Sequence, residues 1–101
     1  MKTAATRTHP GILLRHEFFE PLHVTQLAAA RATGIPQSRL SEILAGRRAI
    51  TADTAARLGR FFRVDPRNFL NLQSSYDLWL VDHQQGKKLD RQVKPLKLVT
   101  A

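Results

Sequence analysis

The chain has 101 residues, of which 43% are hydrophobic, and this is enough for one domain with a single core. Sixteen lysines and arginines against eight acidic residues give a net charge of +8, which indicates an anionic partner, with nucleic acid first and a membrane surface second. The absence of cysteine excludes disulfides, thiolate zinc sites and cysteine nucleophiles. Neither a signal peptide nor an apolar run near the ~20 residues of a membrane span is found. We therefore expect a small soluble cytoplasmic protein.

Proline, glycine and capping residues divide the sequence into short helical segments. The first segment opens at Pro10, where a missing N–H costs nothing, and ends at Pro21. The second runs from the N-cap Thr25 to Thr33, and Gly34 suits the positive φ of a tight stop. The third segment begins near residue 36 and ends at residue 45, with an apolar stripe of Leu40, Ile43 and Leu44.

Two further helices follow. Thr51 is a good N-cap for the fourth helix, which carries Asp53 in its first turn, and Asp65-Pro66 opens a fifth helix that reaches about Gln85. Gly86 is expected to end that helix. The basic residues after it are expected to be disordered when free or to add as an edge strand to a partner. The sequence therefore predicts an all-α, five-helix domain over residues 9–85, with an N-terminal arm (1–8) and a basic C-terminal tail (86–101).

The positive charge is concentrated in two regions. Residues 36–67 hold seven arginines and have a net charge of +4, residues 86–101 carry another +4, and residues 68–85 carry −2. A basic surface of this kind is either a solvated face or the footprint of a phosphate backbone.

The fifth helix carries more apolar surface than one core contact explains. One side collects Phe69, Leu72, Tyr76, Trp79 and Leu80, and a second side carries Leu70, Leu78 and Val81. We expect the second side to form a homodimer interface; the alternative is that loops or the tail fold back over it.

The window from residue 26 to residue 44 has the pattern of a helix-turn-helix. Ala30 is small where two helices must approach, Gly34 follows at the turn, and Leu40 and Ile43 anchor the next helix. An ordinary αα-hairpin within a small bundle is the alternative.

If this segment reads DNA, the outward face of its second helix supplies the contacts. Glutamine pairs with adenine and arginine with guanine, serine bonds to bases or phosphates, and glutamate accepts from cytosine. The base-reading residues expected on this ground are Gln37, Ser38, Arg39, Ser41 and Glu42. Phosphate contacts are expected from Gln26 at the start of the preceding helix, and from Arg47 and Arg48 after the reading helix.

The chain carries six short motifs, at residues 9–11 (HPG), 20–22 (EPL), 25–26 (TQ), 38–51 (SRLSEILAGRRAIT), 71–73 (NLQ) and 76–78 (YDL). Together they resemble the HigA antitoxins, which belong to the Xre-type, lambda-repressor-like helix-turn-helix class. The sequence departs from the family pattern at Ile12, Ala29 and Phe69; Ala29 lightens the core of the motif, with Leu27 as a compensating side chain.

The resemblance implies a dimeric autorepressor that binds double-stranded operator DNA and neutralises a HigB-like toxin, a small RelE-like ribonuclease. Residues on the outward face of the first helix, the tail and the N-terminal arm are all open as toxin surfaces. A stand-alone repressor is the main alternative and a small basic ribonuclease the remote one. The four histidines lack metal-ligand spacing, and His16-Glu17 lacks the second histidine of a zincin motif. We therefore expect no enzyme activity, no metal and no cofactor.

Overall fold

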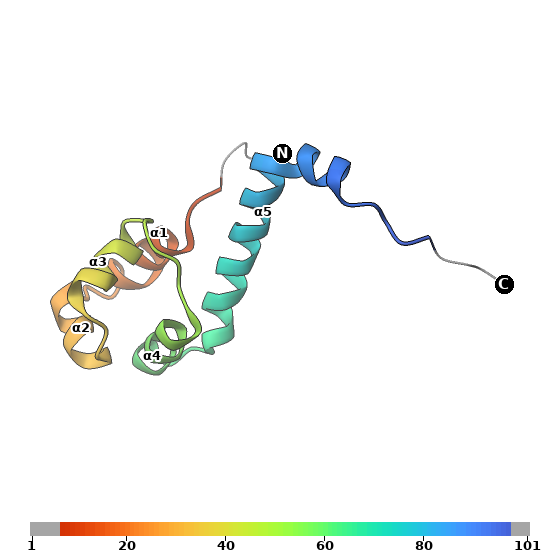
Figure 1. Cartoon of the computed structure of the whole chain (residues 1–101). Helices are drawn as coiled ribbons and strands as arrows, with labels where there is room; N and C mark the ends of the chain where they lie inside the picture. The colour runs from red at the N-terminus through yellow and green to blue at the C-terminus, as the bar shows by residue number, and fades with distance from the viewer. Residues whose placement is uncertain (1–6, 98–101) are drawn as a thin grey trace.

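The computed structural model describes residues 7–97, and within them every regular element is a helix (Figure 1). The elements are α1 (Pro10–Leu14), η1 (Arg15–Phe19), α2 (Gln26–Thr33), α3 (Gln37–Leu44), α4 (Ala52–Phe62) and α5 (Pro66–Gln92). Because η1 continues α1 directly, the predicted all-α, five-helix domain is confirmed. The first six residues of the predicted arm and the last four of the predicted tail lie outside the described part.

The first helix changes pitch half-way along its length. Its N-cap is His9, whose Nδ1 accepts from the Gly11 N–H at 2.9 Å. From Arg15 the backbone adopts π-helical bonding, in which the Glu20 N–H donates to the Arg15 carbonyl at 2.9 Å. Such π turns are rare, and many of them mark functional sites.

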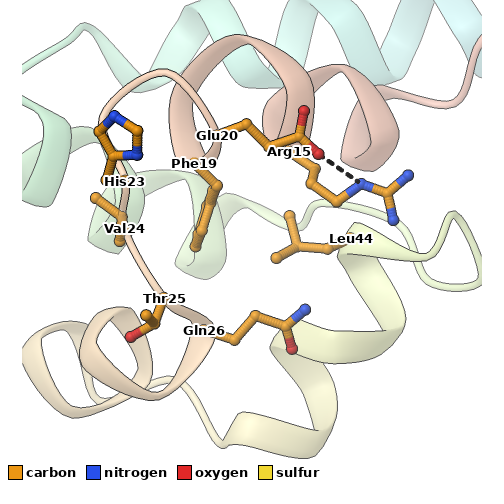
Figure 2. A pocket seen from close by; sticks show the side chains of 8 residues that line it. All are labelled: Arg15, Phe19, Glu20, His23, Val24, Thr25, Gln26 and Leu44. Atoms are coloured by element: carbon orange, nitrogen blue, oxygen red, sulfur yellow. Dashed lines mark ion pairs between the residues drawn. The ribbon is translucent and has the colours of Figure 1, made fainter.

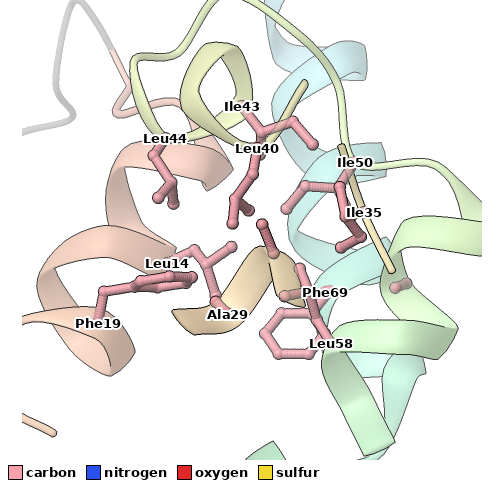
Figure 3. Close-up of a cluster of buried hydrophobic side chains, with 12 residues drawn as sticks. Leu14, Phe19, Ala29, Ile35, Leu40, Ile43, Leu44, Ile50, Leu58 and Phe69 are labelled. Carbon is pink, nitrogen blue, oxygen red and sulfur yellow. The ribbon is translucent and has the colours of Figure 1, made fainter. Parts of the chain in front are cut away.

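The core lies where the first helix, α2, α3, α4 and the start of α5 meet (Figure 3). Leu40 of α3, Leu58 of α4 and Phe69 of α5 are its fully buried centre. The predicted stripe of α3 is confirmed, because Ile43 and Leu44 are also buried. Ala29 of α2 is fully buried, but Leu27 remains 43% exposed. The expectation that Leu27 compensates for the small Ala29 is therefore wrong: it lies on the outer side of α2.

Gly11 sets the distance between the first helix and α3. A Cβ placed on Gly11 would lie 1.7 Å from the carbonyl oxygen of Ile43, well inside van der Waals contact. Only glycine permits this approach of two backbones. The position of α3 in the fold therefore depends on Gly11.

A buried glutamine fastens the loop between α3 and α4 to the fifth helix. Gln73 is 6% exposed; its Oε1 accepts from the Ile50 N–H at 2.9 Å, and its Nε2 donates to Asp77 Oδ1 at 2.9 Å. A buried amide must be satisfied in this way, because an unpaired polar group in the core is costly. Gln73 thus fixes the chain that follows α3.

The end of α5 differs from the sequence prediction. Gln85 has non-helical φ and ψ angles of −144° and 25°, but the helix resumes and reaches Gln92, where the Val93 N–H bonds to the Leu89 carbonyl at 2.8 Å. Gly86 therefore follows a kink instead of ending the helix, because most of the residues at 87–92, among them Lys87, Lys88 and Leu89, are good helix formers. Residues 93–97 then run without regular structure and away from the domain (Figure 1).

The apolar sides of α5 are also arranged differently. Phe69 and the polar Gln73 occupy the core-facing side, whereas Leu72, predicted on that side, is 42% exposed. Leu78 is 68% exposed and Val81 37% exposed, while Leu70 packs partly against the core of its own subunit. The exposed part of the predicted dimer surface therefore consists of Leu78 and Val81.

Below neutral pH, we expect His9 to lower the stability of the fold. The His9 ring lies edge-on to Tyr76, with centroids 5.1 Å apart. Burial lowers the pKa of His9 from its ordinary value of 6.5, and the Asp77 carboxylate opposes this shift in part. On acidification, the unfolded chain takes up a proton on His9 before the folded chain does. The stabilisation of the fold by neutral His9 is therefore complete above pH 6.5 and declines as the pH falls below it.

Denaturant unfolding of the wild type and of His9→Asn between pH 8 and pH 5 measures this effect. Asparagine keeps an N-cap acceptor but does not titrate, so the variant should lose less stability on acidification. Equal losses in the two proteins would assign the acid sensitivity to other groups.

Candidate nucleic-acid interface

Helices α2 and α3 are joined by the tight turn expected of a helix-turn-helix. Thr25 Oγ1 accepts from the Ala28 N–H at 3.1 Å and caps α2, and Gly34 ends it with φ of +79°. In the turn, Thr33 Oγ1 donates to the Ala29 carbonyl at 2.7 Å and accepts from the Ile35 N–H at 3.2 Å. These local bonds fix the angle at which α3 leaves α2.

Arg57 of α4 fixes the same turn from outside the motif. Its Nη1 donates to the Thr33 carbonyl at 2.9 Å, and its Nε donates to Asp53 Oδ2 at 2.9 Å. A Cβ on Gly34 would lie 2.8 Å from this Nη1, so the guanidinium occupies the space that the glycine leaves. Sequence reasoning missed this role of Arg57, although it identified Gly34.

The two faces of α3 separate apolar from polar side chains. Its apolar stripe is buried, whereas Gln37, Ser38 and Arg39 at its N-terminal end are exposed. Ser41 and Glu42 were predicted to point outward with them, but both are half-buried. The first turn of α3 is thus the part of the helix that is open to a groove.

Two predicted DNA contacts form a single unit. Glu42 Oε1 accepts from Arg48 Nε and from Arg48 Nη2, each at 2.8 Å. Glu42 and Arg48 were expected to act separately, one on a base and the other on a phosphate. In the structure the carboxylate instead fixes the direction of the arginine fork, and Arg47 remains exposed beside the pair.

Gln26 lines a hollow between the first helix and α2, with a volume of about 510 Å³ (Figure 2). Arg15 of η1 lines the same hollow, and its guanidinium and the Gln26 amide lie on either side of Leu44 (Figure 2). Arg15 Nε is 3.8 Å from Glu20 Oε2, while Glu20 Oε1 is 2.9 Å from His16 Nδ1. The hollow therefore offers a guanidinium and an amide at its rim. Sequence reasoning did not identify Arg15.

The described residues give little basis for other kinds of site. Within residues 7–97, no group of three or more histidine, aspartate or glutamate residues is placed to hold a metal ion. His16, in the partial zincin motif, is engaged with Glu20. Across the same range, none of the helices combines the length and the apolarity needed to span a bilayer.

Comparison with known proteins decides the family. The helix-turn-helix family model matches residues 16–69. The solved Pseudomonas aeruginosa antitoxin HigA, determined with the higBA promoter, is 36% identical, with a TM-score of 0.84 over 89% of this chain and 98% of that one. The chain belongs to the HigA family.

Two further relatives resemble this chain, one in sequence and shape and one in sequence. Antitoxin GraA in complex with its operator is 33% identical and superposes with a TM-score of 0.87 over 97% of this chain and 99% of that one. Virulence-associated protein I of Dichelobacter nodosus is 42% identical over 77 residues, which is 76% of this chain and 71% of the relative. The domain therefore has the lambda-repressor-like fold of the HigA antitoxins.

Proposed function

We propose that this chain is a dimeric, sequence-specific repressor of its own operon and the antitoxin of a RelE/HigB-like ribonuclease toxin. The observation that carries the DNA-binding part is the division of α3, whose apolar face is buried while Gln37, Ser38 and Arg39 stand exposed at its start. A helix with this division inserts its N-terminal residues into the major groove. The solved structures of HigA with its promoter and of GraA with its operator support DNA binding by this chain.

Each polar residue of the interface then has a distinct role. Gln37, Ser38 and Arg39 read base edges, with Ser41 at the edge of the groove. Arg47 and Arg48 contact the phosphate backbone after α3, with Glu42 as the residue that orients Arg48. Gln26 contacts a phosphate on the other side of α3, and Arg15, across the same hollow, adds a positive group there.

A homodimer completes the proposed repressor. Two copies of α3 read two half-sites of a palindromic operator, about 10 bp apart. The contact surface between the subunits is the α5 face that carries Leu70, Leu78 and Val81. Repression then follows because the bound dimer blocks the promoter.

Two arginine variants should separate base reading from phosphate binding. Arg39→Ala should cost about 1–3 kcal/mol of operator binding and relax the preference for the operator over unrelated DNA. Arg47→Ala should weaken binding to all sequences alike and reduce the slope of log K against log salt by about 1. Fluorescence anisotropy titrations at several salt concentrations on both DNAs measure these quantities. If Arg47→Ala changed the sequence preference, its phosphate role would be wrong.

The antitoxin part rests on membership of the HigA family. Its test is co-expression with the small basic protein encoded beside this gene. We expect the two proteins to co-purify and the growth defect caused by the neighbour alone to disappear. If no such neighbour exists, or if the two do not associate, the chain is a stand-alone repressor.

A further inference from the structure

The fifth helix has three lengthwise stripes, and its own subunit covers only one of them. Positions 69, 73, 76 and 80 face the core, and positions 70, 74, 78 and 81 form the proposed dimer face. A third stripe contains Leu72, Ser75, Trp79 and Asp82. On it, Leu72 is 42% exposed and Trp79 is half-buried, stacked on His83 with ring centroids 5.0 Å apart. A two-fold contact between two α5 helices covers one stripe on each, so the third stripe needs another occupant.

The chain also carries a C-terminal segment with exposed apolar and basic side chains. We call residues 86–97 the C-terminal arm. Val93 is 62% exposed and Leu96 is 84% exposed. The arm has five basic residues against one acidic residue, and none of the ion pairs within residues 7–97 involves it. The arm is therefore both apolar and positively charged, with neither property used in its own subunit.

The arm cannot cover the third stripe of its own helix. After the kink at Gln85, the last helical residues of α5 and the segment that follows them run away from the domain (Figure 1). The described chain has a radius of gyration of 17.4 Å, above the ~13 Å expected for a compact chain of about 100 residues. The alignment with operator-bound GraA spans 97% of this chain, so most of the arm has an aligned counterpart in that protein. A segment with exposed apolar side chains that projects from its own domain needs a partner surface to bury them.

We propose that the C-terminal arm of each subunit packs along the third stripe of α5 in a second copy of the chain. Val93 and Leu96 would cover Leu72 and Trp79, and the arm's lysines would lie beside Asp82. The charges are complementary, because the arm has an excess of four positive charges and the charged residue of the third stripe is the acidic Asp82. This inference deepens the proposed function, since it rests on the homodimer and assigns the arm to dimerisation instead of DNA or toxin binding.

The absence of cysteine makes a directed cross-linking test simple. Ser75→Cys is placed in one chain and Val93→Cys in a second chain that carries a larger tag, and the two are co-expressed. A short bismaleimide should then join the two chains, because Ser75 is exposed between Leu72 and Trp79 on the third stripe. Ala32→Cys on α2, also exposed, replaces Ser75→Cys in the matched control, and this pair should not be joined.

A second measurement asks whether the arm stabilises the dimer. Val93→Asp removes one apolar contact from each arm and therefore two from the dimer, and burial of a valine is worth about 1.5 kcal/mol. The dimer dissociation constant in sedimentation equilibrium should therefore rise roughly 100-fold. The exposure of Val93 means that the variant should still fold. The proposal is wrong if the mixed chains are joined no more than the control while sedimentation still shows dimers, or if Val93→Asp leaves the dissociation constant unchanged.

Operator binding by the same variants separates this proposal from the proposed function. Preference for the operator without a cross-link above the control overturns the arm's role and leaves the repressor intact. A specific cross-link without operator preference supports the arm and overturns the repressor. If Val93→Asp lowers DNA affinity at protein concentrations where the dimer persists, the arm binds DNA and the proposal is wrong.

Discussion

Gly11→Ala is expected to destabilise the protein by about 3 kcal/mol or more. The added Cβ would lie 1.7 Å from the Ile43 carbonyl oxygen, so the backbones of the first helix and α3 would have to separate. For a domain of this size, the midpoint of thermal unfolding should fall by more than about 10 °C. Circular dichroism during heating measures this shift.

Gly86→Ala is the matched control for that substitution. No atom lies within 4 Å of the position a Cβ would take at Gly86, which stands in a helical segment. Alanine there should leave stability unchanged or raise it by up to about 1 kcal/mol. If both alanine variants unfolded at the wild-type temperature, the close approach of the first helix and α3 would be contradicted.

Leu78→Asp is expected to lower operator affinity by about 100-fold without unfolding the domain. Leu78 is 68% exposed in the single subunit, so its replacement leaves the core intact. An aspartate on each side of the two-fold contact places like charges together and should break the dimer. Each subunit then binds one half-site alone, and the gain from linking two sites, typically 10²–10⁴-fold, is lost.

Leu22→Asp is the control for this prediction, because Leu22 is 60% exposed, lies outside α5 and undergoes the same chemical change. It should keep the dimer and the operator affinity of the wild type. Sedimentation equilibrium and anisotropy titrations on a two-half-site operator test both variants together. If Leu78→Asp remained dimeric with full affinity, the α5 face would not be the subunit contact.

The sequence predicted those features that depend on neighbours in the chain. Thr25, Gly34 and Thr51 cap or end their helices as expected, because a cap involves residues two to four positions apart. The buried stripe of α3 was likewise readable from its helical spacing. The helix ends and the buried face of the helix-turn-helix were therefore predictable from the local sequence.

Features that depend on distant parts of the chain were missed. Arg57 bonds to Thr33, and Gln73 to Ile50, across more than twenty residues, and no local pattern marks such pairs. The kink at Gln85 shows the opposite error: a glycine was given more weight than the helix-forming residues that follow it. Glu42 was interpreted only as a group that could bond to a DNA base. The chain after α3 brings Arg48 close to it, and this ion pair was not expected.

The most direct test of the account is a salt-titrated gel shift of the wild-type protein on its own upstream DNA and on an unrelated fragment of the same length. The account predicts cooperative binding of two subunits to the upstream DNA, with a preference that persists as salt weakens binding to the unrelated fragment. Equal binding to both fragments, with the same steep salt dependence, would contradict it. The excess of positive charge would then give only non-specific affinity for DNA.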